Sequence, residues 1–411
     1  PVKNQSELGD QVRDIMMRVR TEGDKALVQY NRQFDGAETD DLRIPDDEIS
    51  DSEKLIPDDL KKAIAIAGSN IEKFHRSQLT VEKPVETLNG VTCWRKSVPV
   101  ERAGLYIPGG TAPLFSTVLM LAIPARIAGC RETIMCTPPD RKGRVNPLIL
   151  YSAKVSGVTS VFRVGGAQAI AAMAYGTETI PATDKIFGPG NQYVTKAKEM
   201  VQLDGIPIDM PAGPSEVLVI ADENAEPSFV ATDLIAQAEH GADSQVVLVS
   251  TSIRLISEVR DEIGRQLLLL PRRAIAEKAL ENSMLIFFDT PDKCMAFSNR
   301  YAPEHLIIAV SDPASSAELV RNAGSVFLGK YSCESAGDYA SGTNHTLPTN
   351  GYARSYSGVS TESFMKRITF QELTAEGIRV LGPVIEKMAE AEMLEGHKNA
   401  VTIRLNSLKN G

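Results

Sequence analysis

The chain has 411 residues, of which 43% are hydrophobic and 24% are charged, and this composition excludes a disordered, collagenous or coiled-coil protein. Its 44 basic and 53 acidic side chains leave a formal net charge of −9, which argues against broad binding to nucleic acid or to anionic membranes. At roughly 150 residues per domain, the length predicts two or three domains. A soluble, acidic, multidomain protein is therefore expected.

The N-terminal part of the chain predicts amphipathic helices. Apolar residues recur at steps of three or four in residues 1–35 and again in residues 58–75. His75 lies between Lys73 and Arg76 in the second of these helices and is expected at the surface. No apolar run is long enough to cross a membrane, no signal peptide is recognisable, and the five cysteines form no CxxC pair. These features predict a cytoplasmic protein with reduced thiols.

From about residue 103 the pattern changes to short apolar runs, bounded by Gly and Pro, that alternate with helical segments. Strand–helix alternation of this kind predicts parallel sheets covered by helices. One series ends near residue 201 and a second runs from 216 to 329, so two α/β units are expected in succession. The helical tail after Leu373 has 38 residues, too few to bury a core alone, and must pack on something else.

Three glycine-rich turns follow apolar runs in the first α/β series. They are IPGGTAP at 107–113, VGGAQA at 164–169 and GPGNQ at 188–192. Each opens a predicted helix, whose free N–H groups and dipole favour phosphate. None is a GxGxxG motif, and one such turn alone is more typical of an ordinary strand–helix connection. Three in succession favour a nucleotide-like ligand.

Two pairs of polar residues are candidates for chemistry. Gln237 and His240 are three positions apart in the last turn of a helix that ends at Gly241, which suits two ligands of one metal or a histidine at the helix dipole. Glu304 and His305 directly precede a predicted strand. A carboxylate beside an imidazole is a plausible proton-transfer pair, although a solvated loop explains the same sequence equally well.

Further candidates lie in the C-terminal third of the chain. The Gly/Ser/Thr/Asn-rich segment 333–358 contains Asp338 and His345, and the tail contains Glu392 and His397. Long irregular segments inside compact domains are usually functional or disordered, and the tyrosines of this one argue against disorder. Folding could gather these Gln, His and Asp side chains into one metal site, with zinc as the first candidate. Taken alone, the residues predict an α/β enzyme with a nucleotide-like ligand and a candidate metal site.

Longer motifs add a resemblance to a known family. VGGAQAIAAMAYGTE, KIFGPGNQYVTKAKE, IDMPAGPSE, AQAEHG, NRYAPEHL and ESAGDYASGTNHTLPT resemble the motifs of histidinol dehydrogenases, in order, from roughly residue 10 to 405. The resemblance implies oxidation of L-histidinol to L-histidine through L-histidinal, the last steps of histidine biosynthesis. It also implies one Zn²⁺ per subunit, two NAD⁺ per reaction, and a homodimer that binds neither nucleic acid nor membrane.

The resemblance further implies a fold and its boundaries. The expected fold is α/β, with two incomplete Rossmann-like parallel-sheet domains and a small helical C-terminal domain exchanged between protomers. Residues 1–105 and 214–372 would form the first domain, 106–213 the second, with the NAD contacts, and 373–411 the exchanged tail.

Site residues are carried over from the family by motif. The implied zinc ligands are Gln237, His240, Asp338 and His397. The implied acid/base pair is Glu304 and His305. The implied NAD contacts are Tyr106, Gln168 and Asn191. The implied substrate contacts are Ser215, Gln237, His240, His305, Asp338, Glu392 and His397.

Three other functions compete with this interpretation. The first is a related zinc- and NAD-dependent dehydrogenase acting on another small polar alcohol, such as the sulfopropanediol type. Glu392 and His397 match the tail of the histidinol enzyme and argue against it. A zinc hydrolase would use the same Glu, His and metal but no nucleotide. A non-catalytic binding protein would have little need for so many polar groups with matching roles.

Overall fold

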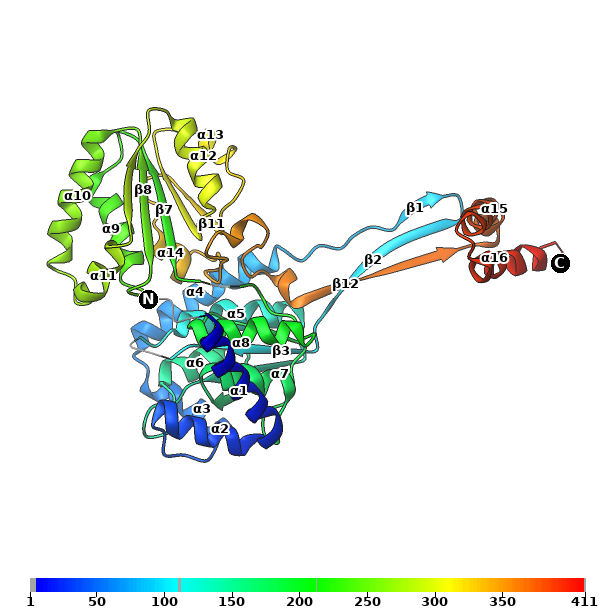
Figure 1. Cartoon of the computed structure of the whole chain (residues 1–411), viewed down its shortest axis with the longest axis horizontal. Helices are drawn as coiled ribbons and strands as arrows, with labels where there is room; N and C mark the ends of the chain where they lie inside the picture. The colour runs from blue at the N-terminus through cyan, green and yellow to red at the C-terminus, as the bar shows by residue number, and fades with distance from the viewer. Residues whose placement is uncertain (1–4, 110–111, 212, 410–411) are drawn as a thin grey trace. The chain divides into compact units, whose positions relative to one another are not determined.

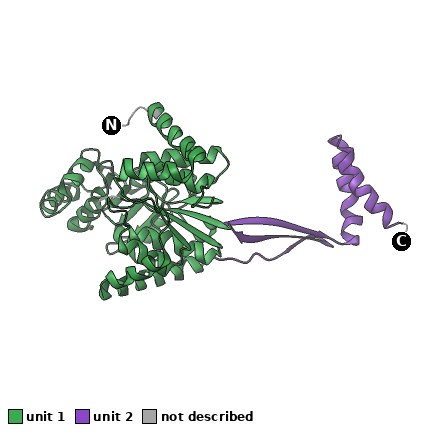
Figure 2. Cartoon of the chain, turned by 90° about the horizontal axis from the view of Figure 1, so that it is seen from below, with its two compact units in different colours: residues 1–78, 100–364 green, residues 79–99, 365–411 purple. Residues whose placement is uncertain are grey.

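The computed structural model describes residues 5–109, 112–211 and 213–409. Contacts divide the chain into two compact units, 1–78 with 100–364 and 79–99 with 365–411 (Figure 2). The larger unit contains two parallel sheets, and the smaller one contains an antiparallel sheet and two helices. Gly110 and Thr111 of the predicted turn at 107–113 lie outside the described residues.

The first parallel sheet of the larger unit has four strands in the order β5-β4-β3-β6. The strands are β3 (Arg102–Tyr106), β4 (Glu132–Thr137), β5 (Ser160–Arg163) and β6 (Lys185–Phe187). They are buried along almost their whole length, as expected for strands covered on both faces. Because the chain passes from β5 to the far side of β3, the direction of winding reverses between β3 and β6. The predicted strand–helix alternation is confirmed.

Helices connect these strands and cover the sheet (Figure 1). The connecting helices are α5 (Phe115–Ala128), α6 (Pro147–Ser156) and α7 (Gly166–Tyr175), and α8 (Gln192–Leu203) follows β6. The preceding elements are α1 (Gln5–Glu22), α2 (Asp24–Tyr30), the π-helix η1 (Asn31–Asp35), α3 (Asp46–Asp51), η2 (Ser52–Leu55) and α4 (Asp58–Arg76). The apolar stripe of α1, which includes Val12, Met16 and Val19, packs with α7 and α8. The N-terminal helices therefore belong with the four-stranded sheet.

His75 is buried, so its predicted surface position is wrong. It continues the inner stripe of α4, after Ile64 and Ile71, because its spacing puts it on that face. Its Nδ1 lies 2.9 Å from the Ile71 carbonyl oxygen and its Nε2 lies 3.2 Å from the Asn344 side-chain nitrogen. Burial lowers the pKa of His75, because desolvation disfavours the charged ring more than the backbone hydrogen bond to Ile71 favours it.

The second parallel sheet of the larger unit has five strands in the order β11-β10-β7-β8-β9. The strands are β7 (Glu216–Ala221), β8 (Gln245–Ser250), β9 (Met284–Phe287), β10 (His305–Ala309) and β11 (Ser325–Leu328). The helices are α9 (Pro227–Ala238), α10 (Ile253–Leu267), α11 (Arg273–Leu280), α12 (Pro291–Tyr301), α13 (Pro313–Ala317) and α14 (Glu334–Tyr339), with short turns η3 (Tyr352–Arg354) and η4 (Thr361–Phe364). Helices α9 to α11 cover one face, and α12 and α13 lie over the other (Figure 1).

The smaller unit pairs its three strands antiparallel, in the order β1-β2-β12. The elements are β1 (Val85–Leu88), β2 (Val91–Pro99), β12 (Met365–Leu373), α15 (Ala375–Ala391) and α16 (Glu395–Ser407). Residues 79–99 and 365–372, predicted within the first domain, fall in the same compact unit as the tail. Among the described residues, no helix combines the length and apolarity needed to cross a bilayer.

Candidate active site

Catalytic candidates gather at the amino ends of the five-stranded sheet. Glu216 and His305 are the first residues of the neighbouring strands β7 and β10, and Glu304 directly precedes His305. All three are buried, which excludes the solvated-loop interpretation of Glu304 and His305. The Glu216 backbone N–H donates to Glu304 Oε2 at 2.8 Å, so the carboxylate is held by the neighbouring strand.

The His305 ring lies among acceptors on both sides. Its Nδ1 is 3.3 Å from the Glu216 carbonyl oxygen and 3.7 Å from Glu304 Oε2. Its Nε2 is 3.5 Å from Asp338 Oδ1 and has no hydrogen-bond partner among the described residues. Burial disfavours the charged ring, but the carboxylates of Glu334, Glu304 and Asp338 outweigh burial and raise the pKa of His305 to about 10.

A group of candidate metal ligands lies beside this pair. The ligand atoms of His240, Glu334 and Asp338 lie within 4.8 Å of one another. Gln237, at the end of α9, is fully buried. In one orientation its amide donates to Glu304 Oε2 at 3.4 Å. Turned over, it donates to Glu334 and accepts from the Glu216 backbone N–H at 2.8 Å.

Glu334 is the residue that the sequence interpretation missed. It lies four positions before Asp338 in α14, so both carboxylates share one helical face. That spacing was a signal in the sequence, but an exposed helix would show the same pattern. In the structure Glu334 is buried, and its Oε2 has no hydrogen-bond partner among the described residues.

Burial dominates the electrostatics of the carboxylates. It raises the pKa of Glu216 and of Glu304 to about 7, and that of Glu334 to about 8. Burial alone would also raise the pKa of Asp338, but the charge of His305, whose Nε2 is 3.5 Å from Asp338 Oδ1, lowers it. Several acidic groups share one buried volume, which therefore favours a cation.

His345 supports α14 rather than joining the candidate ligands. Its Nδ1 is 2.9 Å from the Asp338 carbonyl oxygen, and its Nε2 is 3.2 Å from Thr117 Oγ1 on α5. Burial lowers its pKa. The ring thus links the end of α14, which carries Asp338, to a helix of the four-stranded sheet.

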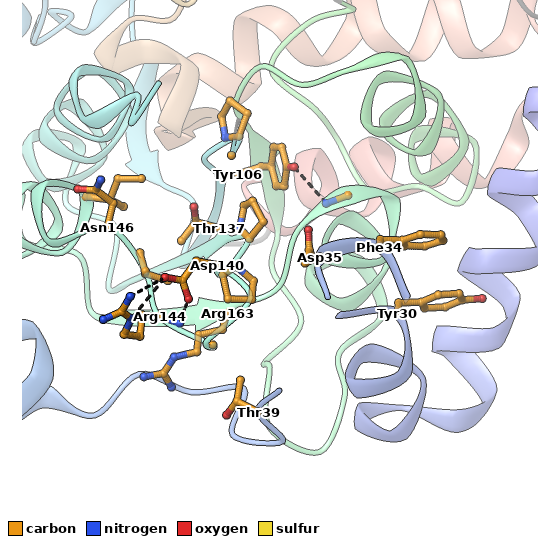
Figure 3. A pocket seen from close by; sticks show the side chains of 18 of the residues that line it. Tyr30, Phe34, Asp35, Thr39, Tyr106, Thr137, Asp140, Arg144, Asn146 and Arg163 are labelled. Atoms are coloured by element: carbon orange, nitrogen blue, oxygen red, sulfur yellow. Dashed lines mark hydrogen bonds and ion pairs between the residues drawn. The ribbon is translucent and has the colours of Figure 1, made fainter. Parts of the chain in front are cut away.

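The implied dinucleotide contacts line a different site. A cavity of about 1800 Å³ lies at the carboxyl ends of β3, β4 and β5, with Tyr106 in its wall (Figure 3). Gln168 and Asn191 also line it. The Tyr106 hydroxyl accepts a hydrogen bond from the Gly166 backbone N–H at 3.1 Å. Asn191 caps α8, since its Oδ1 accepts from the backbone of Tyr193 at 3.0 Å.

The turns of this cavity need their glycines. Gly166 has φ of +65° at the start of α7. At Gly188 a Cβ would overlap the Tyr106 carbonyl oxygen. The Gly188 backbone N–H donates to Asp209 Oδ2 at 2.8 Å, and Lys198 Nζ donates to the Gly188 carbonyl at 2.8 Å. Lys198 and Asp209 also form a buried ion pair, so this turn is held from both sides.

The remaining implied residues are Ser215, which is the neighbour of Glu216, and two residues of the smaller unit. Ser215 directly precedes β7, and its carbonyl accepts from the Gln245 backbone N–H at 3.0 Å. Glu392 follows α15 and His397 lies in α16, both in the smaller unit and both exposed. Within the larger unit, the structure therefore brings Gln237, His240 and Asp338 together with Glu304 and His305.

Comparison with known proteins decides the family. The family model for histidinol dehydrogenase matches residues 1–405. The chain belongs to the histidinol dehydrogenase family. It is 59% identical to a histidinol dehydrogenase of Bacteroides thetaiotaomicron, over all of this chain and 96% of the relative. It is 52% identical to one of Vibrio parahaemolyticus, over 97% of this chain and 92% of the relative.

A solved structure agrees with this assignment. The histidinol dehydrogenase of Elizabethkingia anophelis superposes with a TM-score of 0.97 at 56% identity, covering all of this chain and 94% of that one. The family consists of NAD-dependent oxidoreductases, and this chain is one of them. An acetylating aldehyde dehydrogenase of Geobacillus thermoglucosidasius, at 13% identity and a TM-score of 0.50 over 90% of this chain and 92% of that one, shares the fold alone.

Proposed function

We propose that this protein oxidises L-histidinol to L-histidine through L-histidinal, with two NAD⁺ and one Zn²⁺ per subunit, in the cytoplasm. These are the final steps of histidine biosynthesis. The observation that carries the proposal is the buried pair Glu304 and His305 beside Gln237, His240 and Asp338. It occurs in a chain that is 59% identical to a histidinol dehydrogenase over its whole length.

The donor set of this cluster suits zinc. It offers an imidazole nitrogen, an amide oxygen and carboxylate oxygens, which zinc accepts as ligands, and Glu334 Oε2 lacks a hydrogen-bond partner among the described residues. Gln237, His240, Asp338 and the partner's His397 would hold the ion. When bound, zinc supplies a Lewis acid that orients the amino and imidazole nitrogens of the substrate. Glu334 would accept a hydrogen bond from the Gln237 amide nitrogen and so set the orientation of that amide.

The first oxidation needs a base for the alcohol proton. We assign this role to His305, whose buried Nε2 has no hydrogen-bond partner among the described residues. The surrounding carboxylates favour the protonated ring, and a bound Zn²⁺ would offset their charge, so that the neutral ring could accept the proton. As the proton moves to His305, the hydride of the same carbon leaves to NAD⁺, and the products are the aldehyde and NADH. A positioned base of this kind contributes about 10²–10⁴-fold to the rate.

The second oxidation needs a base for water. Glu304 is adjacent to His305, and burial raises its pKa to about 7, which is close to the operating pH expected of a general base. It would take a proton from the water that attacks the aldehyde carbon. A second hydride then leaves to NAD⁺ from the tetrahedral intermediate, and the carboxylate of L-histidine forms.

The dinucleotide would occupy the cavity of the four-stranded sheet. Its strand order, β5-β4-β3-β6, is the order with which dinucleotide-binding sheets begin, and such ligands bind at the carboxyl ends beside the reversal of winding. Tyr106, Gln168 and Asn191 line the cavity there and would contact NAD⁺.

A second copy of the chain would complete each active site. The partner's His397 would serve as the fourth ligand, and the partner's Glu392 together with Ser215 would contact the substrate. Val380, Val384 and Met388 recur every four residues on α15 and are 48%, 53% and 63% exposed. An apolar stripe of this kind needs a covering surface, and exchange of a tail between two protomers is a low-cost way to provide one.

The experiment is an assay of purified protein with Zn²⁺, NAD⁺ and L-histidinol, followed by NADH absorbance and by quantification of L-histidine. About two NADH should form for each histidinol consumed. Formation of one NADH with accumulation of aldehyde would contradict the four-electron reaction. Turnover of another small polar alcohol, but not of histidinol, would favour the related dehydrogenase instead.

A further inference from the structure

Asp35 lies in the wall of the proposed dinucleotide cavity, and one oxygen of its carboxylate has no hydrogen-bond partner among the described residues. It is the last residue of the π-helix η1, and its side chain lies near Tyr106 in the cavity wall (Figure 3). Its Oδ2 is buried and has no hydrogen-bond partner among the described residues. Burial raises the pKa of Asp35 to about 6, so at neutral pH the group is still mainly a carboxylate. A buried acceptor without a donor costs free energy unless a ligand supplies one.

The turn that carries Asp35 is tied to the sheet. Asn31, at the start of η1, is fully buried and donates to the Arg163 carbonyl oxygen at 2.6 Å, at the carboxyl end of β5. Gly36 ends the π-helix with φ of +64°. The Arg163 guanidinium in turn donates to the Arg43 carbonyl at 2.9 Å. The π-helix that ends in Asp35 is therefore fixed beside the end of β5 through Asn31, and short π-helical segments are frequent at functional sites.

The charge around Asp35 is unfavourable for an additional phosphate. Six acidic side chains line the cavity, against only the three basic ones of Lys142, Arg144 and Arg163. Arg144 is paired with Asp140 at 3.2 Å, and Arg163 forms an ion pair with Glu48. A carboxylate in this wall suits a ligand that offers hydroxyl donors and repels one that adds negative charge.

The position of Asp35 also indicates which end of a dinucleotide it would meet. In the larger unit, α2, which leads into η1, lies on the side of the four-stranded sheet away from the five-stranded sheet (Figure 1). The nicotinamide must reach the alcohol beside His305, at the five-stranded sheet. If the nicotinamide of NAD⁺ lies near His305, the adenosine half of NAD⁺ would lie near Asp35.

We propose that Asp35 accepts hydrogen bonds from the hydroxyls of the adenosine ribose and thereby makes this protein select NAD⁺ over NADP⁺. The inference rests on the proposed use of NAD⁺. In NADP⁺ the 2′-hydroxyl carries a phosphate, so one donor to Asp35 is lost and a second anion is forced against a half-buried carboxylate. A site built to accept hydrogen bonds from a hydroxyl rejects a ligand that lacks it more strongly than an apolar site does.

The test compares Asp35→Asn with Asp14→Asn. Asp14 lines the same cavity but is exposed, so its variant changes the charge equally without touching the buried oxygen. Binding of ADP-ribose and of 2′-phospho-ADP-ribose is measured by calorimetry, and kcat/KM is measured with NAD⁺ and with NADP⁺. Wild type should bind ADP-ribose at least about tenfold more tightly, and Asp35→Asn should lower both preferences about tenfold. Asp14→Asn should keep the wild-type preference.

Several outcomes would overturn the inference. If the wild-type protein binds ADP-ribose and 2′-phospho-ADP-ribose equally tightly, the inference is wrong, and no variant is needed to show this. An unchanged preference in a folded Asp35→Asn protein, or in Asp35→Ser if the first variant unfolds, also overturns it. If Asp35 were merely structural, both ligands would weaken equally and the melting temperature would fall. A wild type that neither binds ADP-ribose nor reduces NAD⁺ would instead contradict the proposed function itself.

Discussion

The two parallel sheets of the larger unit present opposite edges for function. The cavity of the four-stranded sheet lies at the carboxyl ends of its strands, where Tyr106 ends β3. The catalytic candidates of the five-stranded sheet lie at the amino ends, where Glu216 and His305 begin β7 and β10. Ligands of open α/β sheets usually bind at the carboxyl ends, so the second sheet departs from the general rule.

The difference follows from which helix termini meet each edge. At carboxyl ends the connecting helices begin, so free backbone N–H groups and the positive end of the dipole suit the phosphates of a nucleotide. At amino ends the helices finish. The last turn of α9 brings Gln237, and the turn that follows it brings His240, to carboxylates that favour positive charge. One edge is suited to an anion and the other to a cation. A change at one edge should therefore leave the function of the other edge intact.

Removal of metal should have the largest effect and should act on the amino edge only. The proposed ligands include two imidazoles and no thiolate, so the ion should be exchangeable and should compete with protons as pH falls. Chelation should abolish turnover, while the melting temperature and ADP-ribose binding stay near those of the untreated protein. Full activity in protein shown by elemental analysis to be metal-free would contradict the zinc site.

Glu304→Gln should separate the two half-reactions. Because Glu304 is proposed to activate water, the variant should slow oxidation of supplied histidinal by about 10²–10⁴-fold and affect the first hydride transfer far less. His305→Asn should slow both steps. Single-turnover NADH formation from histidinol and from histidinal measures this directly. Equal losses in both steps for Glu304→Gln would show that the roles are assigned wrongly.

Lys198→Met should disturb the carboxyl edge only. It leaves Asp209 buried and without its ion-pair partner, which costs about 3–5 kcal/mol of unfolding free energy, and it frees the turn at Gly188. Lys196→Met is the matched control, because its pair with Glu199 is partly exposed and worth about 0–1 kcal/mol. Urea unfolding and ADP-ribose titration measure both effects, and zinc content should not change. Similar losses in the two variants would refute the proposed anchoring of the turn.

Mixing of inactive subunits should reveal whether the amino edge is completed by a partner. Gln237→Ala and His397→Ala should each be inactive as homodimers. After subunit exchange, about half of the dimers should be mixed, each with one site that carries no lesion, so activity should return to roughly a quarter of wild type. If the tail served its own chain, every site would keep a lesion. No recovery with heterodimers verified by mass would therefore mean that the site is built within one chain.

Much of the fold could be predicted because it depends on neighbours along the chain. Strand–helix alternation indicated both parallel sheets, and the three glycine turns pointed to the edge where the cavity lies. These signals are local, since they reflect the period of each element and the backbone conformation of its turns. The family was likewise recognisable from contiguous motifs, and the matching family model confirms it.

Only the tertiary structure decided which polar residues meet and what surrounds them. His75 and Glu334 look like surface residues in the sequence, yet both are buried, because burial depends on segments distant along the chain. Asp338 lies beside His240 and His305, although the three residues belong to three separate sequence motifs. The unpartnered oxygen of Asp35 and the raised pKa of Glu304 depend on the same long-range packing, because desolvation is a property of the folded volume rather than of the local sequence.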